Sequence, residues 1–311
     1  MILRHLEYLV ALAREAHFGR AAAACGVTQP TLSAAIRELE AELDVLIVER
    51  GQRFRGLTAE GERVVEWARR ILSDRDALRQ EVGSARQGLS GNLALGVIPT
   101  ALAIVGLLVS SFQKEHPRVR IKILSLSSIE IQRGLDIFDL DAGVTYLDNE
   151  PLRRVETVPL YRERYFLVTG DLAAFRRRNN VTWAEAVDLP LCLLTPDMQN
   201  RRIINAIFDK ASRMPAPLVE TNSLLALYAQ LRSRGMATVL TQASLYLLGT
   251  PRWLRALPLV APSARASIGL VYPERKPQPP VARAFVDSVS KLDIDGEMQR
   301  DIPSALRERQ R

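Results

Sequence analysis

The sequence predicts a chain of mixed class: a small helical N-terminal region with a wing, one long helix, and a C-terminal α/β region. Three observations support this prediction. Two short helical patterns meet at a tight turn that contains Gly26, which is the arrangement of a helix-turn-helix. One helical pattern runs from about residue 59 to residue 87. From residue 91 onward, short apolar runs alternate with helical patterns, as in α/β domains.

The first two helices are predicted from apolar spacing. Residues 2–14 form an amphipathic pattern whose apolar side consists of Leu3, Leu6, Leu9, Val10 and Ala13. We expect Phe18 and Gly19 to break this helix. The segment GRAAAACG should form the second helix, with Gly26 in the position of a C-cap.

A third helix should begin at Thr28 or Gln29 and run to about Leu43. Pro30 is compatible with its first turn, where backbone N–H groups have no intrahelical partner. The side opposite its apolar residues is almost free of long charged side chains and carries Pro30, Ser33, Ala34 and a single Arg37. Such a bare face indicates that another surface approaches this helix closely.

A wing and a long helix follow. The segment LIVERGQRFRGLT predicts two short strands around Gly51 and Gln52, and Thr58 can cap the next helix. Within that helix a heptad seam has one polar member, Arg75, and otherwise consists of Val64, Ala68, Ile71, Leu78, Val82 and Ala85. The seam could pack on its own domain or on a second copy of the chain. We favour self-association, because the helix is long and otherwise highly charged.

The α/β region contains a recurrent arrangement of strand, hydroxyl or amide residue, then helix. We expect a mostly parallel sheet from the runs LALGVI, VRIKILSL, LDAGVT, YFLVTG, LCLLT, ATVLT and IGLVYP. Ligands of open α/β sheets bind at the carboxyl ends of strands, where helix N-termini suit a small anion. The candidate effector-binding residues are therefore Pro99, Thr100, Ser127, Ser128, Thr145, Thr195 and Asn222. Each alone could be a plain N-cap.

Arg201 and Arg202 follow Thr195 early in a predicted helix. They could add positive charge to the effector site, or they could belong to a solvated helix face. The two alternatives are equally compatible with the sequence.

Composition narrows the class of protein. The net charge is +7, which suggests an acidic partner, but residues 1–90 contain 13 Arg, no Lys and 13 acidic residues. Any binding of nucleic acid by that region must therefore depend on local clustering of arginines. No run approaches 18 apolar residues and no signal-peptide pattern is present, so we expect a cytoplasmic protein without membrane contact. Cys25 and Cys192 are expected to be reduced, buried thiols.

An enzyme is not favoured. The three histidines, His5, His17 and His116, have no partner at metal-ligand spacing, and the motifs GxSxG, GxxxxGK[ST] and GxGxxG do not occur. We therefore expect no catalytic residue, no metal and no cofactor.

These residues resemble the LysR-type transcriptional regulators. The match is strongest over residues 1–60, in the order F-x-R-A-A-A, VTQPTLSAAIRELEAEL, IVERG and LTAEGERV. The resemblance implies a winged helix-turn-helix over residues 1–58, a dimerising linker helix over 59–88, and an effector domain over 89–311. That domain would be two-lobed and similar to periplasmic binding proteins, with lobe I at about 91–162 and 268–300 and lobe II at about 163–267.

Family members are typically dimers or tetramers that bind imperfect inverted repeats of double-stranded DNA and act on the transcription machinery. The resemblance therefore implies a regulator that responds to a small anionic metabolite, with Val64, Ala68, Ile71, Leu78 and Val82 in dimerisation. The segments LDNEPL and LCLLTPDMQNRR are similar to a branch of cyanate- and formate-metabolism regulators. Asp44, Ala34, Ala35 and His17 depart from the usual family pattern.

A DNA-contact hypothesis follows, with the third helix in a major groove. Gln29, Thr31, Ser33 and Arg37 would reach bases or phosphates, Thr28 a phosphate, and Pro30 and Ala34 would share this face. Ala34 and Ala35 could contact thymine methyl groups or simply leave room. On the wing, Arg50, Arg53 and Arg55 would hold the backbone or a narrow minor groove. The alternatives are a small-molecule binding protein without DNA binding and an enzyme on a binding-protein fold.

Overall fold

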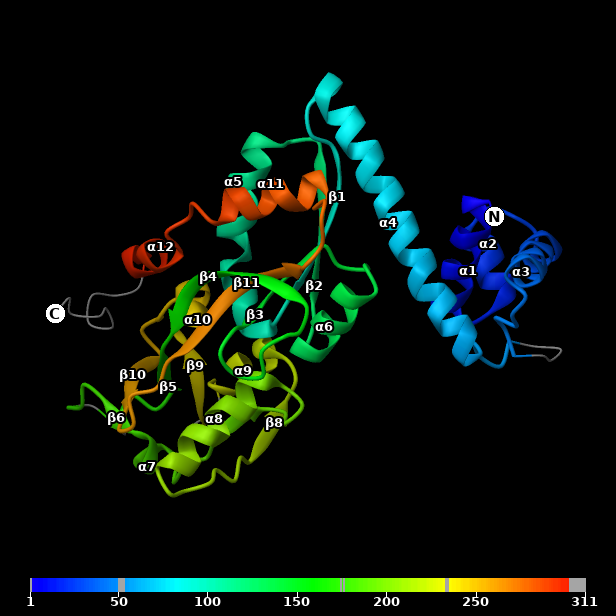
Figure 1. Cartoon of the computed structure of the whole chain (residues 1–311). Helices are drawn as coiled ribbons and strands as arrows, with labels where there is room; N and C mark the ends of the chain where they lie inside the picture. Colours follow the sequence, from blue (N-terminus) through cyan, green and yellow to red (C-terminus); the bar gives the residue numbers. More distant parts are fainter. Residues whose placement is uncertain (1, 50–53, 174, 176, 233–234, 302–311) are drawn as a thin grey trace. The chain divides into compact units, whose positions relative to one another are not determined.

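A computed structural model describes residues 2–49, 54–173, 175, 177–232 and 235–301. The chain divides into two compact units, each described by itself below: residues 1–89 with Gln278–Pro280, and the remainder of the chain. Figure 1 shows the helices of the first unit and the mixed sheets of the second.

The first unit is a small helical domain around one apolar core. Its helices are α1 (Leu3–Glu15), α2 (Phe18–Ala24), α3 (Gln29–Leu43) and α4 (Ala59–Gln87). Leu6, Leu9 and Leu12 of α1 pack in the core with residues of the other three helices. The predicted break at Phe18 and Gly19 is wrong, because both residues lie inside α2.

The chain turns before α2 at two residues. Ala16 adopts a left-handed conformation, and the His17 side chain caps α2. Its Nδ1 accepts hydrogen bonds from the backbone N–H groups of Gly19 at 3.0 Å and Arg20 at 3.3 Å. The His17 imidazole is thus the N-cap of α2, a position that Ser, Thr, Asn or Asp usually occupies.

The link between α3 and α4 is held by hydrogen bonds. Asp44 ends α3 in the left-handed conformation, with φ 52°, that glycine more often provides. The Glu40 carboxylate accepts from the N–H groups of Ile47 at 2.8 Å and Val48 at 3.1 Å. Thr58 caps α4 as predicted, because its Oγ1 accepts from the Gly61 N–H at 2.9 Å. A side chain at Gly61 would collide with the Ile47 carbonyl oxygen.

The predicted wing is represented by a single antiparallel bridge between Val48 and Leu57. The turn predicted around Gly51 and Gln52 lies outside the described part of the chain. Phe54 lies against Phe18 of α2 in an edge-to-face arrangement, with ring centroids 6.1 Å apart. The base of the wing is therefore packed on the helical core.

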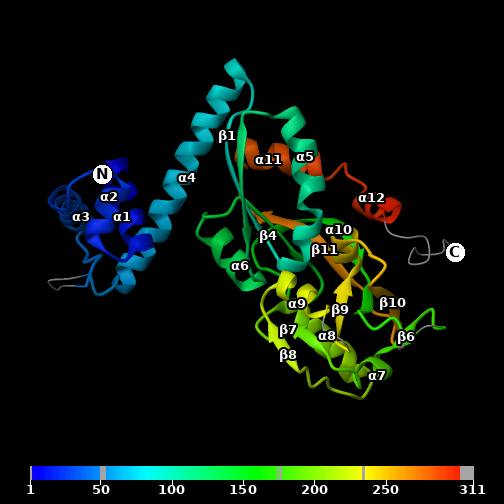
Figure 2. The ribbon, with the colours of Figure 1, turned by 180° about the vertical axis from the view of Figure 1, so that it is seen from behind.

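The second unit contains two lobes. We use lobe I for the five-stranded sheet with its helices, and lobe II for the two smaller sheets with theirs. Lobe I has the strand order β2-β1-β3-β11-β4, and lobe II has a sheet of order β6-β10-β5-β9 and a pair β7-β8. Figure 2 shows the same elements from behind.

The elements of lobe I are β1 (Gly91–Val97), η1 (Pro99–Ile104), α5 (Val105–Glu115), β2 (Val119–Ser125), α6 (Ser128–Asp136), β3 (Ala142–Tyr146), β4 (Val155–Glu163), β11 (Ala266–Pro273), α11 (Pro280–Val289) and α12 (Ile294–Asp301). Those of lobe II are β5 (Tyr165–Thr169), β6 (Val181–Thr182), α7 (Trp183–Ala186), β7 (Cys192–Leu194), α8 (Gln199–Lys210), β8 (Val219–Thr221), α9 (Leu224–Gln230), β9 (Ala237–Thr241), α10 (Gln242–Leu248) and β10 (Arg255–Val260).

The sheets are mixed, which corrects the expectation of a mostly parallel sheet. Strand β1 pairs in parallel with β2 and β3, but β11 pairs antiparallel with both β3 and β4. In lobe II, β5 is antiparallel to β9 and β10. The difference arises because the chain passes from lobe I to lobe II along β4 and β5, and returns along β10 and β11.

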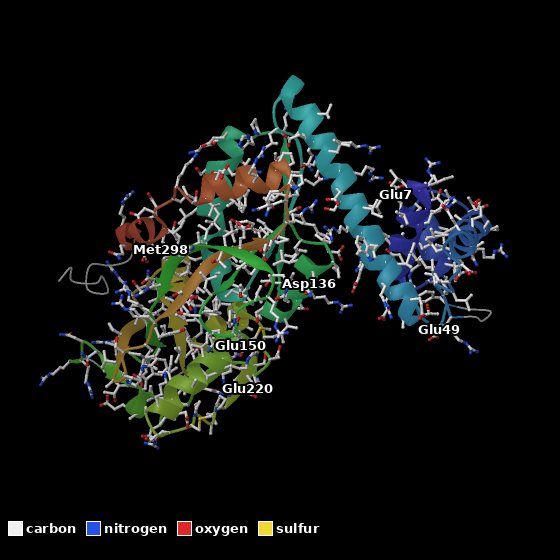
Figure 3. All side chains as sticks on the ribbon, viewed as in Figure 1. Glu7, Glu49, Asp136, Glu150, Glu220 and Met298 are labelled. Carbon is white, nitrogen blue, oxygen red and sulfur yellow. The ribbon has the colours of Figure 1, made fainter. Side chains whose placement is uncertain are left out.

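Each lobe has its own core. Phe112 of α5 and Phe285 of α11 meet edge-to-face with centroids 5.2 Å apart in lobe I. In lobe II, Trp183 lies between Phe208 and Tyr165, at centroid distances of 5.0 and 5.8 Å. Met298 of α12, labelled in Figure 3, is fully buried. Among the described residues, no helix is long and apolar enough to cross a bilayer.

Candidate nucleic-acid interface and ligand cavity

The exposed face of α3 carries the side chains that the sequence singled out. Thr28, Gln29, Pro30, Thr31 and Arg37 are exposed, and Ser33 and Ala34 are half-buried. The Thr28 Oγ1 accepts from the Thr31 N–H at 3.4 Å and lies 2.8 Å from the Thr31 Oγ1. Ala35 is 5% exposed and packs in the helical core, so it is not available to contact a base.

Arg37 is a free cation on this face. Its side chain is exposed, and no described residue forms a hydrogen bond or an ion pair with it. On the wing, Arg55 is exposed, whereas Arg50 and Arg53 lie outside the described residues. The face thus combines short hydroxyl and amide side chains with an available guanidinium group.

The predicted heptad seam of α4 divides into two parts. Ala68 is fully buried in the core of the helical domain, and Val64 and Ile71 pack against that core. Arg75 forms an ion pair with Glu7 of α1 and another with Asp76 at 2.8 Å. Beyond Arg75 the apolar members are free: Leu78 is 65% and Val82 is 60% exposed. The side chain of Ala85 lies outside the described part.

The first half of α4 packs on its own domain, which reduces the part of the predicted seam that is open to a second copy. Ala68 is a core residue of its own domain, and Val64 and Ile71 are partly used there. The surface left for a second copy is therefore the exposed part of α4, with Leu78 and Val82. Trp67, which is 61% exposed, lies under the guanidinium of Arg70 at 5.5 Å.

The strand-end residues of the second unit fall into two groups. Ser127 and Ser223 are plain N-caps, of α6 and α9. Thr100, Thr145 and Thr195 are not caps. The hydroxyl groups of Thr145 and Thr195 are buried without a hydrogen-bond partner among the described residues. The alternative of a plain N-cap thus holds for Ser127, whereas Ser128 is the first residue of α6 and is buried.

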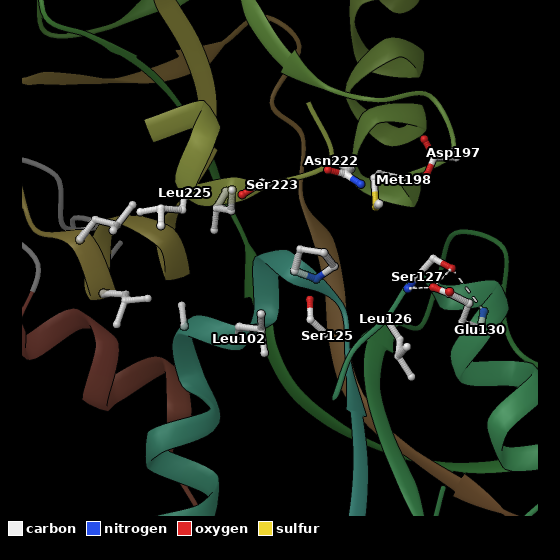
Figure 4. Close-up of a pocket in the computed structure, with 15 residues that line it drawn as sticks. Leu102, Ser125, Leu126, Ser127, Glu130, Asp197, Met198, Asn222, Ser223 and Leu225 are labelled. Carbon is white, nitrogen blue, oxygen red and sulfur yellow. Dashed lines mark hydrogen bonds between the residues drawn. The ribbon is translucent and has the colours of Figure 1, made fainter. Parts of the chain in front are cut away.

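A cavity of about 760 Å³ lies between the two lobes. Lobe I contributes Leu102, Leu126, Ser127 and Glu130, and lobe II contributes Met198, Asn222 and leucines of α9 and α10. In Figure 4 the labelled side chains of the two lobes face one another across this space. Apolar side chains dominate its walls, and none of the described lining residues is Arg, Lys or His.

A small polar recess adjoins this cavity. Its volume of about 10 Å³ is enough for roughly one water-sized group. Pro99, Ser127 and Met198 line both spaces. The other recess walls are Ile98, Thr100, Ser128, Tyr146, Leu194, Gln199 and Asn200.

Behind the recess lies a buried carboxyl group. The Tyr146 hydroxyl donates to Glu163 Oε2 at 2.7 Å and accepts from Asn200 Nδ2 at 2.9 Å. Thr100 Oγ1 is 3.5 Å from the same hydroxyl. Glu163 is 0% exposed, and burial raises its pKa to about 7 against the hydrogen bond from Tyr146, which lowers it.

This network connects the lobes, because Tyr146 is on β3 of lobe I and Asn200 is on α8 of lobe II. Neither of these residues, nor Glu163, was among the site residues predicted from the sequence. Glu163 and Tyr165 flank Arg164 where the chain passes between the lobes. Glu163 ends a strand in which polar and apolar residues alternate, and glutamates in such strands are usually exposed. No local signal in the sequence could therefore have shown that Glu163 is buried.

The comparisons with known proteins agree with this architecture. The profile of the LysR substrate binding domain matches residues 86–292, and that of bacterial regulatory helix-turn-helix proteins of the lysR family matches residues 3–62. This chain belongs to the LysR family. The prediction from the motifs of residues 1–60 is therefore confirmed.

Several LysR-family relatives match over nearly the whole chain. The DNA-binding transcriptional dual regulator OxyR of Escherichia coli strain K12 is 29% identical over 98% of this chain and 100% of its own. The structure of a full-length OxyR variant from Pseudomonas aeruginosa has a TM-score of 0.75 at 26% identity, covering 94% of this chain and 99% of that one. Full-length CbnR complexed with its target DNA shares the fold, with a TM-score of 0.66 at 22% identity over 93% and 99%.

In this LysR-family chain the two arginines predicted for the effector site are both paired with other groups of the same chain. Arg201 is 5% exposed, and its guanidinium donates to the Leu194 carbonyl and to Glu220 at 2.6 Å each, and to Asn205 at 2.9 Å. Neither the cavity nor the recess is lined by it. Arg201 is therefore a buried, paired residue, which matches neither added charge in the ligand site nor a solvated helix face.

Arg202 is likewise paired within the chain, with Glu150. It holds Glu150 through two hydrogen bonds of 2.7 and 2.5 Å and donates to the carbonyl groups of Pro196 and Asp197. This pair lowers the pKa of Glu150 and joins lobe II to the loop after β3. Glu150 and Glu220, the acidic partners of the two arginines, are labelled in Figure 3.

The two cysteines of this LysR-family chain are shielded. Cys192 is fully buried in β7, and Cys25 is half-buried at the end of α2. Burial raises the pKa of both thiols, which lowers the fraction present as reactive thiolate at neutral pH.

Proposed function

We propose that this chain is a sequence-specific DNA-binding transcriptional regulator whose affinity for DNA, or its geometry on DNA, is set by a small molecule bound between the lobes. The exposed α3 face with the free Arg37 is the observation that carries the DNA-binding part. The membership of this chain in the LysR family also supports DNA binding. We assign DNA binding to residues 1–58, the linker helix to 59–88 and effector binding to 89–311.

The third helix would enter a major groove. Gln29, Thr31, Ser33 and Arg37 would contact base edges or phosphates, and Thr28 a phosphate near the helix start. The proposed wing contacts rest on Arg50, Arg53 and Arg55. DNA carrying an imperfect inverted repeat would engage two copies of the chain, since most homo-oligomers are symmetric.

Self-association would use the exposed part of α4. The stripe of Leu78 and Val82 lies beyond the part of the helix that packs on its own domain. Leu78→Asp with Val82→Asp should shift the protein toward monomer in sedimentation velocity, while its circular dichroism stays unchanged. If the double variant keeps the native mass in solution, Leu78 and Val82 are not part of the interface.

The proposed regulator is not an enzyme, resides in the cytoplasm and contacts the transcription machinery. Its response would depend on ligand binding and not on thiol oxidation, because burial raises the pKa of both thiols. Peroxide treatment should leave its DNA footprint unchanged, although the relative from Haemophilus influenzae is named a hydrogen peroxide-inducible genes activator.

A gel-shift assay with the DNA upstream of the chain's own coding sequence tests the proposal. We expect a discrete complex that survives competition by unrelated DNA. A protein that binds small molecules but never shifts any DNA would support the rival function of a binding protein without DNA binding. A turnover screen with an identified ligand separates the remaining alternative, an enzyme.

A further inference from the structure

The cavity and the recess between the lobes together describe the chemistry of one ligand. We propose that the effector is an uncharged amphipathic molecule, whose apolar body occupies the large cavity and whose single hydroxyl-sized polar group enters the recess. This inference rests on the proposed function, and it concerns the class of molecule that the same site accepts.

Shape provides the first step. The large cavity has a volume of about 760 Å³, in the range of small-molecule sites, and its walls are mostly leucine, methionine, alanine and proline side chains. The recess, with about 10 Å³, admits one small group. Because Pro99, Ser127 and Met198 line both spaces, a single molecule can fill them together.

Hydrogen bonding provides the second step. Gln199 is 3% exposed and lines the recess, and its Oε1 has no hydrogen-bond partner among the described residues. Its Nε2 donates to the Asn149 carbonyl oxygen. An unpaired buried acceptor is costly, so a ligand group that donates a hydrogen bond is favoured. A hydroxyl can donate to Gln199 of lobe II and also pair with the hydroxyl of Thr100 of lobe I, which lines the same recess.

Charge provides the third step. The nearby cations Arg201 and Arg202 already hold Glu220 and Glu150. Two carboxyl groups, of Glu130 and Asp197, line the large cavity. Behind Tyr146 lies Glu163, whose own ionisation is already suppressed by burial, with a pKa of about 7. A ligand carboxylate would be desolvated here without a cationic partner, which is strongly unfavourable.

One feature of the site favours the opposite outcome. No side chain caps the N-terminus of α8, so its first-turn N–H groups could receive an anion. The test must therefore compare charges on the same molecular body.

Thermal unfolding of the full chain with two matched probe sets makes that comparison. One set is benzyl alcohol, benzoate and benzylammonium, and the other is 1-hexanol, hexanoate and hexylammonium. A ligand bound by the native state raises the unfolding temperature, and its concentration dependence gives an apparent Kd. In at least one set we expect the alcohol to bind at least roughly tenfold tighter than its charged partners.

Two variants locate the binding. Thr100→Val should reduce the advantage of the alcohol, because it removes one of its two hydrogen-bond partners, and Thr100→Ser should restore it. The matched control is Thr238→Val, which removes another fully buried hydroxyl from β9, outside both spaces.

A carboxylate or an ammonium that binds tightest in both sets overturns the proposal, as does the absence of binding by either alcohol. A gel shift with the same preparation tests DNA binding separately, so failure of one proposal is distinguishable from failure of the other.

Discussion

Helix α3 of the first unit and helix α8 of the second unit use their arginines in opposite ways. On α3, Arg37 is exposed and available to a partner. On α8 of lobe II, Arg201 and Arg202 are occupied by carboxylate and carbonyl groups of the protein itself. Arg37 is therefore available to an external group, whereas Arg201 is held within lobe II and Arg202 joins lobe II to the loop after β3.

An arginine beside a helix start therefore does not by itself make an anion site. The guanidinium group must also lack a better partner. Four substitutions test this contrast, and they follow in decreasing order of the change that we expect.

Glu163 should produce the largest effect, seen in the pH dependence of stability. Its pKa is about 7 in the folded chain and near 4.5 when unfolded, so the native state binds the extra proton. Its contribution to the free energy of unfolding is fully present below pH 4.5 and is lost as the pH rises through 7. The loss is on the order of 3 kcal/mol.

Urea unfolding of wild type and Glu163→Gln from about pH 5 to 8 measures this contribution. The variant should lack that part of the pH dependence. Glu150→Gln is the control with the opposite sign, because the pKa of Glu150 is lowered and its contribution is lost as the pH falls. Parallel pH profiles for wild type and Glu163→Gln would show that Glu163 is not protonated in the folded chain.

Arg201→Ala should destabilise the second unit by about 2–3 kcal/mol, because it leaves the Leu194 carbonyl group without its charged donor. Thermal unfolding followed by circular dichroism measures the change. Arg201→Met keeps much of the side-chain volume and separates packing from hydrogen bonding. An unchanged melting temperature for both variants would show that the hydrogen bonds of Arg201 contribute little to stability.

Arg37→Ala should leave stability unchanged and weaken binding to the cognate DNA by about 1–3 kcal/mol, if the guanidinium reads a guanine. Arg37→Lys should lose most of that discrimination, since an ammonium cannot form the planar bidentate contact. Arg79→Ala removes an exposed charge from α4 as a control. Equal weakening on all DNA sequences would make Arg37 a phosphate contact.

Arg202→Ala should have the smallest effect, at most about 1 kcal/mol, because both partners of its ion pair with Glu150 are partly exposed. Differential scanning calorimetry at low and high salt would register it. The loss should shrink at high salt. A loss as large as that of Arg201→Ala would place the Arg202–Glu150 pair among the main contacts between the lobes.

Local signals in the sequence were sufficient for the helices of the first unit. The Thr28 and Thr58 caps gave the correct starts of α3 and α4, because capping depends on residues within one turn. The turn before α2 was misplaced, since a histidine cap is not a usual signal. Strand β4 was missed because it is an edge strand with exposed polar residues and contains Pro159, which edge strands tolerate.

The helices of the first unit, the bare face of α3 and the family follow from the sequence alone, because they depend on short-range patterns. The side chains that remain available to a partner follow only from the tertiary packing. That packing placed Ala68 in a core, gave Arg201 and Arg202 their partners, and buried Glu163 beside Tyr146 between the lobes. Burial and partner choice depend on residues distant in the chain, so spacing along the sequence could not specify them.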